Sequence, residues 1–165
     1  MEITFTHTGG GKDWVYVLRD DGTPLRWPWP SYGTELPHDL LHYVVETRLG
    51  VRRGFWGLVA DGVNFGFVSR AADQIHAGAA PAPGTDPDVD VVELVQVECV
   101  ARALDGDTDA DCLARARRSC AEHEVPVPEM LTAESLGLLR AEVRDLAARW
   151  RALAAGRSLV LPYRR

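Results

Sequence analysis

The first thirty residues consist of short segments in which apolar and polar residues alternate, and this pattern limits the possible folds most strongly. Residues 2–8 and 13–19 alternate with a period of two, which is the spacing of a β-strand with two different faces. Glycine-containing turns at 9–11 and 20–22 separate these segments from each other and from a third candidate strand at 24–29. The pattern predicts an antiparallel β-meander.

The rest of the chain mostly has helical spacing of its apolar residues. We expect helices over residues 37–49, 53–61, 91–104, 109–122 and 133–155, although the β-branched start of 91–104 could also be a strand. The segment 63–69 is ambiguous between a strand and a helix end. A final strand at 158–163 is expected to join the N-terminal sheet. The predicted fold class is therefore α+β, a small antiparallel β-meander plus a C-terminal strand packed against about five helices. We expect a single domain over 1–165, with a mobile surface loop, or alternatively a lid, near 77–88.

Charge and composition exclude several classes of function. The chain has 165 residues and a net charge of −6, so neither nucleic acid nor an anionic membrane is expected as a partner. It contains no apolar run long enough to span a membrane and no signal-peptide pattern at its start. Three cysteines at unrelated spacings indicate reduced thiols, and together these features predict a cytoplasmic protein.

The sequence HDLLH at residues 38–42 is the strongest candidate for a functional site. Its two histidines lie four residues apart and therefore share one face of a helix, at the boundary of the apolar stripe. The motif resembles the HExxH sequence of zinc-dependent peptidases. The resemblance implies that His38 and His42 bind zinc or another divalent metal. Asp39 stands where that family has its catalytic glutamate, so it is the candidate catalytic residue, or a residue that orients an imidazole.

A metal needs at least a third protein ligand, which we expect from another part of the chain. Glu46 continues the same helical face but lies about two turns from His38. The candidate donors elsewhere are His7, His76, Glu93, Glu98 and His123. Glu98 is the preferred one, because a helical reading places its carboxylate among apolar residues, where it needs a cation or a histidine as partner. No motif for a nucleotide or another organic cofactor is present.

Two interpretations of these residues remain open. In the first, the protein is a small metal-binding protein with hydrolase-type chemistry at His38, His42 and Glu98. In the second, it is a non-enzymatic binding or protein-interaction module, and the histidine helix is structural. The histidines could also act as an acid–base pair without a metal. The apolar residues at 136–153 form either a core-facing seam or a homodimer interface. Eight aromatic residues of the first third form a core or, alternatively, an apolar ligand pocket or a partner surface.

Two further patterns carry less information about function. The acidic stretch at 105–111 begins like a calcium loop, but Ala110 and Ala116 replace its essential glycine and glutamate, so we expect a solvated turn with Asp107 or Asp109 capping the next helix. The chain also resembles small uncharacterised proteins of high-GC bacteria that have a PHDLxH…VE helix followed by GFWG, here residues 37–46 and 54–57. That resemblance implies no particular activity.

Overall fold

The computed structural model describes residues 1–30, 35–79 and 89–164. Their contacts divide the chain into two compact units. We call Met1–Leu41 with Ala141–Arg164 the sheet unit, and residues 42–140 the helical unit. Two helices, α1 (His38–Leu49) and α6 (Ala133–Arg151), contribute residues to both units. The single-domain organisation stays a prediction.

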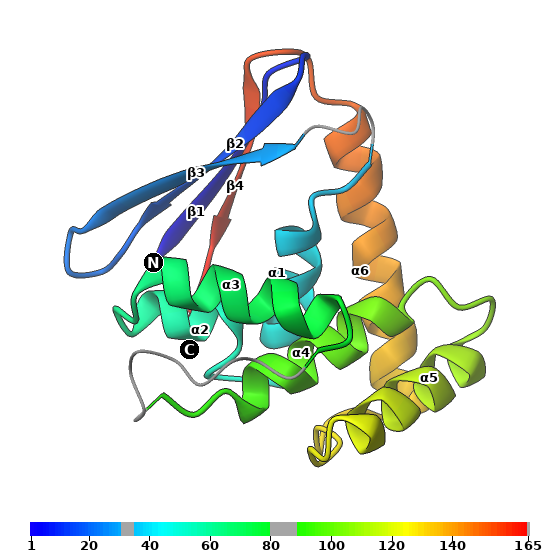
Figure 1. The fold of residues 1–165 in the computed structure, drawn as a ribbon. Coiled ribbons are helices and arrows are strands. Elements are labelled where there is room, and N and C mark those ends of the chain that lie inside the picture. The colour runs from blue at the N-terminus through cyan, green and yellow to red at the C-terminus, as the bar shows by residue number, and fades with distance from the viewer. Residues whose placement is uncertain (31–34, 80–88, 165) are drawn as a thin grey trace. The chain divides into compact units, whose positions relative to one another are not determined.

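The sheet unit contains the predicted meander together with the C-terminal strand. All neighbouring strands are antiparallel and follow the order β3-β2-β1-β4, so the last strand lies beside the first (Figure 1). This arrangement confirms the predicted fold class. The four strands are β1 (Glu2–His7), β2 (Lys12–Leu18), β3 (Pro24–Pro30) and β4 (Arg157–Pro162).

The alternation along each strand separates a buried face from an exposed face of the sheet. Ile3 and Phe5 are buried and pair in register with buried residues of β2 and β4, so one face is continuously apolar. Tyr16 lies on the other face and is 39% exposed. There its ring is tilted against that of Trp14, whose own ring lies below the Arg26 guanidinium. Trp14 and Tyr16 therefore do not form part of a core in the way that Phe5, Phe55 and Trp56 do.

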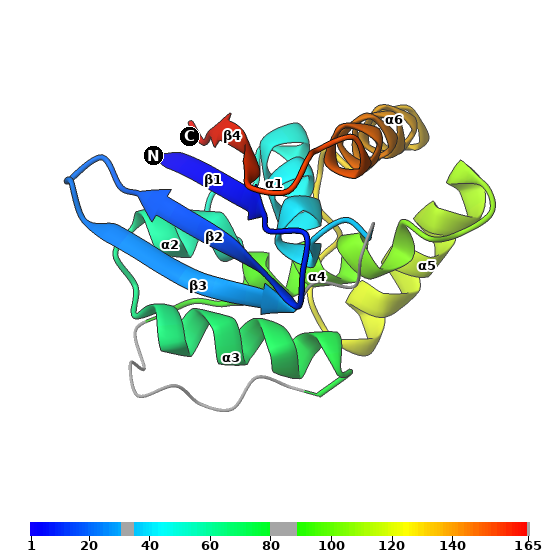
Figure 2. The same ribbon diagram turned by 90° about the horizontal axis from the view of Figure 1, so that it is seen from above.

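The helical unit is built around a buried helix, α4. This helix packs against α3 and α5, and α3 in turn packs against α2 (Figure 2). The described part of the chain contains six helices in all, one more than the approximate number predicted. Besides α1 and α6, these helices are α2 (Phe55–Ala60), α3 (Phe65–His76), α4 (Val92–Ala103) and α5 (Asp109–Glu122).

Several details differ from the expectations because capping decides where helices begin and end. The ambiguous segment 63–69 is the start of α3, whose first turn is capped by the Asn64 side chain. Thr108, and not Asp107 or Asp109, caps α5. Thr132 caps α6 as expected, but this helix ends at Arg151. The predicted loop at 77–88 lies outside the described residues from 80 onwards.

The apolar seam of α6 is largely covered by the chain itself. Four of its residues, namely Leu136, Leu139, Leu146 and Trp150, are at most 2% exposed. This burial agrees with the core-facing alternative for those positions. None of the described helices combines the length and the apolar character that crossing a membrane requires.

Candidate metal centre

A buried carboxylate in the middle of α4 is the centre of the site. Glu98 is 1% exposed, and its Oε1 atom lies 2.9 Å from Nε2 of His42 on α1. Its Oε2 atom lies 3.6 Å from Nδ1 of His76, at the end of α3. Three helices that are distant in sequence thus bring two imidazoles to one carboxylate inside the helical unit. The prediction that Glu98 is buried beside a histidine is confirmed.

Neighbouring aromatic rings fix the position of His42. Its ring lies 5.1 Å from that of Phe55, with an angle of 44° between the planes, and Phe55 packs edge-on against Trp56. All three side chains are at most 3% exposed. Rotation of the imidazole would leave a void in a packed core, so the ring is held with Nε2 toward Glu98.

His76, the third residue at this carboxylate, connects the buried pair of His42 and Glu98 to the surface. The His76 side chain is 55% exposed, whereas those of His42 and Glu98 are at most 2% exposed. The group therefore extends from the core to the surface. This is the arrangement that a metal-binding or catalytic site requires, because a ligand must be able to enter from solvent.

The distances within the group are close to those between ligands of one metal ion. Two donors that each bind an ion at about 2.05 Å lie roughly 2.9 Å apart in an octahedral site and roughly 3.3 Å apart in a tetrahedral one. The separations of 2.9 and 3.6 Å at Glu98 fall near these values. The two distances are measured to different oxygens of Glu98, so one ion shared by all three side chains would require these side chains to shift.

The two other residues of the histidine motif lie on the preceding turn of α1. Donor atoms of His38, Asp39 and His42 all lie within 4.8 Å of one another. Asp39 is 7% exposed, and its Oδ2 atom accepts a hydrogen bond of 3.0 Å from Nε1 of Trp27. One carboxylate oxygen is thereby held in place, as in carboxylates that orient a metal ligand.

Glu46, the last residue on this face of α1, binds the backbone at the start of α2. Its carboxylate accepts hydrogen bonds from the backbone N–H groups of Trp56 at 2.9 Å and Gly57 at 3.0 Å. N–H groups in the first turn of a helix have no carbonyl partner within that helix, so Glu46 satisfies two of them in α2, and its negative charge also suits the helix dipole. A methyl group on Gly54 would come within 2.6 Å of the Glu46 carboxyl carbon, so the GFWG segment needs its first glycine for this approach.

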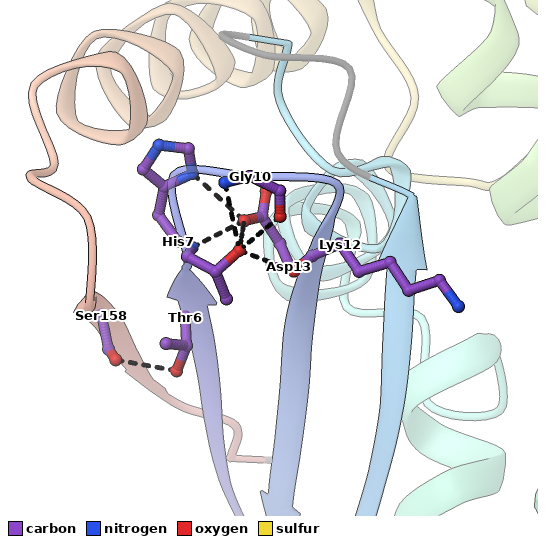
Figure 3. Close-up of polar contacts among 7 residues, drawn as sticks. Thr6, His7, Gly10, Lys12, Asp13 and Ser158 are labelled. Atoms are coloured by element: carbon purple, nitrogen blue, oxygen red, sulfur yellow. Dashed lines mark hydrogen bonds and ion pairs between the residues drawn. The ribbon is translucent and has the colours of Figure 1, made fainter.

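The remaining candidate ligands are spread over the two units. Glu93 accepts hydrogen bonds from the backbone N–H groups of Arg52 and Arg53, and His123 ends α5. His7 contacts Asp13 in the sheet unit, with Nδ1 3.2 Å from Oδ1 (Figure 3). Sequence reasoning missed the role of Asp13. The sequence did contain a signal for its burial, because Asp13 lies two residues before Val15 and therefore on the inward side of an alternating strand.

The acidic stretch and the cysteines are accounted for by other contacts. Asp105 and Asp111 pair with Arg115, and Asp109 pairs with Arg140. These carboxylates of the stretch that resembles a calcium loop therefore form ion pairs with arginines. All three cysteines are free thiols and buried. A hydrogen bond from the neighbouring Cys120 thiol lowers the pKa of Cys99 to about 7, and the same bond raises the pKa of Cys120.

Comparison of the chain with protein-family models, with curated protein sequences and with solved structures gives no match. The resemblances of HDLLH to the zinc-peptidase motif and of the chain to proteins of high-GC bacteria therefore gain no support from them. Any functional conclusion rests on the geometry of the chain itself.

Proposed function

We propose that the protein binds a divalent metal ion through His42, His76 and Glu98. The observation that carries this proposal is a carboxylate, 1% exposed, that faces imidazole nitrogens from two other helices. A charged carboxylate in such a place needs a strong electrostatic partner. His38 stays the predicted additional ligand from the preceding turn of α1.

The donor set favours a transition metal over calcium or magnesium. Two imidazoles with one carboxylate are the ligands of many catalytic zinc sites and of non-haem iron sites, whereas calcium and magnesium prefer oxygen ligands. Three protein ligands leave a position for water or substrate. We therefore expect zinc, or iron as the alternative.

Hydrolase-type chemistry is the activity that we expect of such a site. A metal with an open position lowers the pKa of bound water and polarises the bond to be cleaved. In this proposal Asp39 would accept the proton from that water or orient an imidazole ligand.

Zinc titration followed by calorimetry tests the proposal directly, on protein first treated with EDTA. We expect one zinc per chain, a higher melting temperature with zinc, and loss of both effects in His42→Gln. The matched control is His123→Gln, because His123 ends a different helix and contacts none of the three ligands in the described structure. This control should bind like the wild type.

Two outcomes would overturn the proposal. The first is unchanged melting with zinc and with EDTA, which would make the three residues a structural network. The second is equal loss of zinc in His42→Gln and His123→Gln. If zinc binds as expected, the proposed role of Asp39 in hydrolysis can be tested next. The measurement compares the rates at which the wild type and Asp39→Asn hydrolyse nitrophenyl esters.

The exposed face of the sheet favours a second candidate function, a protein-interaction module. Tyr16 and Val160 flank Thr4 in register across three strands and are 39% and 53% exposed. Leu18, on the same face, is 52% exposed. If a second copy covers this face, sedimentation at increasing concentration will show a dimer that Tyr16→Lys abolishes.

A further inference from the structure

A second feature of the helical unit is a small pocket between α4 and α5, which neither the metal centre nor the sheet uses. Its volume is about 200 Å³. From α4 it is lined by Cys99 and Arg102, and from α5 by Arg115, Arg118, Ser119 and Glu122. These spacings of three and four residues place each set on one helical face.

The charges around this pocket are unusual for the chain. Three guanidinium groups and a single carboxylate line it, although the protein as a whole has a net charge of −6. Guanidinium groups that are brought together repel one another unless an anion lies between them. Arginines of this pocket that have no ion-pair partner would therefore be stabilised by a bound anion.

Two of the three arginines are available for a ligand. Arg115 already pairs with Asp105 and Asp111, at 3.2 and 2.9 Å. Arg102 makes only a hydrogen bond of 3.4 Å to the Ile75 carbonyl, and within the described residues neither it nor Arg118 forms an ion pair. The Ser119 hydroxyl supplies a further donor.

We propose that this arginine pocket binds the phosphate group of a small molecule. Guanidinium groups donate paired, parallel hydrogen bonds that match the oxygens of phosphate. The volume suits one such group with little else. Asp105, Asp111 and Glu122 lie around it and would repel a long polyanion, which argues against nucleic acid. The proposal is independent of the metal centre.

Calorimetric titrations with inorganic phosphate and with glycerol phosphate test this proposal. They are made at constant ionic strength, because salt screens exposed charges, and both with and without EDTA. We expect saturable binding with and without EDTA. Tighter binding of glycerol phosphate would identify a phosphate ester as the ligand, whereas equal binding would identify free phosphate.

Three exposed positions on α5 provide matched variants. Arg118→Ala should weaken binding at least fivefold, and Glu122→Gln should tighten it two- to fivefold by removing the repulsive carboxylate. Arg117→Ala removes the same charge from the adjacent position, which does not line the pocket, and should have no effect. Equal weakening by Arg117→Ala and Arg118→Ala would overturn the proposal, as would binding that EDTA abolishes or that chloride reproduces.

Discussion

Two histidine–carboxylate pairs of the described structure, His7–Asp13 and His42–Glu98, differ in almost everything except their chemistry. His7 and Asp13 are six residues apart on one β-hairpin, and the His7 side chain is 19% exposed. His42 and Glu98 lie on separate helices, and both side chains are at most 2% exposed. The first pair can form as soon as its hairpin forms, whereas the second requires the helical unit to be assembled.

The surroundings of the two carboxylates differ in the same way. Asp13 also accepts a hydrogen bond of 2.8 Å from the backbone N–H of Thr8, so its contacts hold the turn between β1 and β2 (Figure 3). Glu98 instead faces a second imidazole, that of His76. A carboxylate bonded to its own turn stabilises local structure, whereas one that gathers side chains from distant helices has the composition of a site. Four substitutions test this distinction.

Removal of the buried carboxylate is expected to have the largest effect. Glu98→Ala leaves His42 without its acidic partner in a dry core, and breaking a buried ion pair costs about 3–5 kcal/mol. Urea denaturation should show this loss in the free energy of unfolding. A loss no larger than the one expected for the hairpin pair, about 1–2 kcal/mol, would mean that the two pairs contribute equally to stability.

A change near another buried carboxylate, that of Glu46, should have an intermediate effect. Gly54→Ala brings a methyl group within 2.6 Å of Glu46 and 2.7 Å of Val97, and such overpacking typically costs about 1–3 kcal/mol. Gly10→Ala is the control, because a methyl group there meets no atom within 4 Å. Equal thermal stability of the two variants would show that Glu46 can move away without loss.

The hairpin pair should matter less than the buried pair. Asp13→Asn removes a charge but keeps an oxygen acceptor for Thr8, so we expect a loss of about 1–2 kcal/mol in the free energy of unfolding. Zinc affinity should not change, because the hairpin pair has no role in the proposed centre. Weaker zinc binding in this variant would contradict the separation of roles.

The smallest effect on stability is expected at His76, where the effect on binding should be clear. The His76 side chain is 55% exposed, and exposed substitutions usually change stability by less than about 0.5 kcal/mol. Loss of a ligand should nevertheless weaken zinc binding at least about tenfold. His76→Gln therefore separates a ligand from a merely structural residue, and unchanged zinc affinity would remove His76 from the centre.

Most of the fold follows from local sequence patterns. The alternation in residues 2–19 and the glycine turns specify the meander. The bounds of α5 were predicted correctly because its helical spacing of apolar residues and the turns on either side of it indicate the same ends. Asp107 and Asp109 were wrong as caps because three neighbouring side chains could cap the same helix equally well, and only the backbone geometry decides among them.

The candidate site was less accessible to sequence reasoning. Burial of Glu98 followed from its place in an apolar helix, but the approach of His76 depends on how α3 packs against α4, which no local pattern encodes. The role of Glu46 was missed for the same reason. Its helical face was evident, whereas its partners are backbone N–H groups of another helix, and a sequence does not show these.

The link between Glu46 and α2 has a consequence for hydrogen exchange. A helix of six residues is too short to be stable alone, so α2 persists only while α1 supplies the acceptor for its first turn. The amide protons of Trp56 and Gly57 can exchange with solvent only when the two helices separate. Since α2 also carries the ring that holds His42, the exchange rates of these two amides report directly on whether the proposed metal centre is assembled.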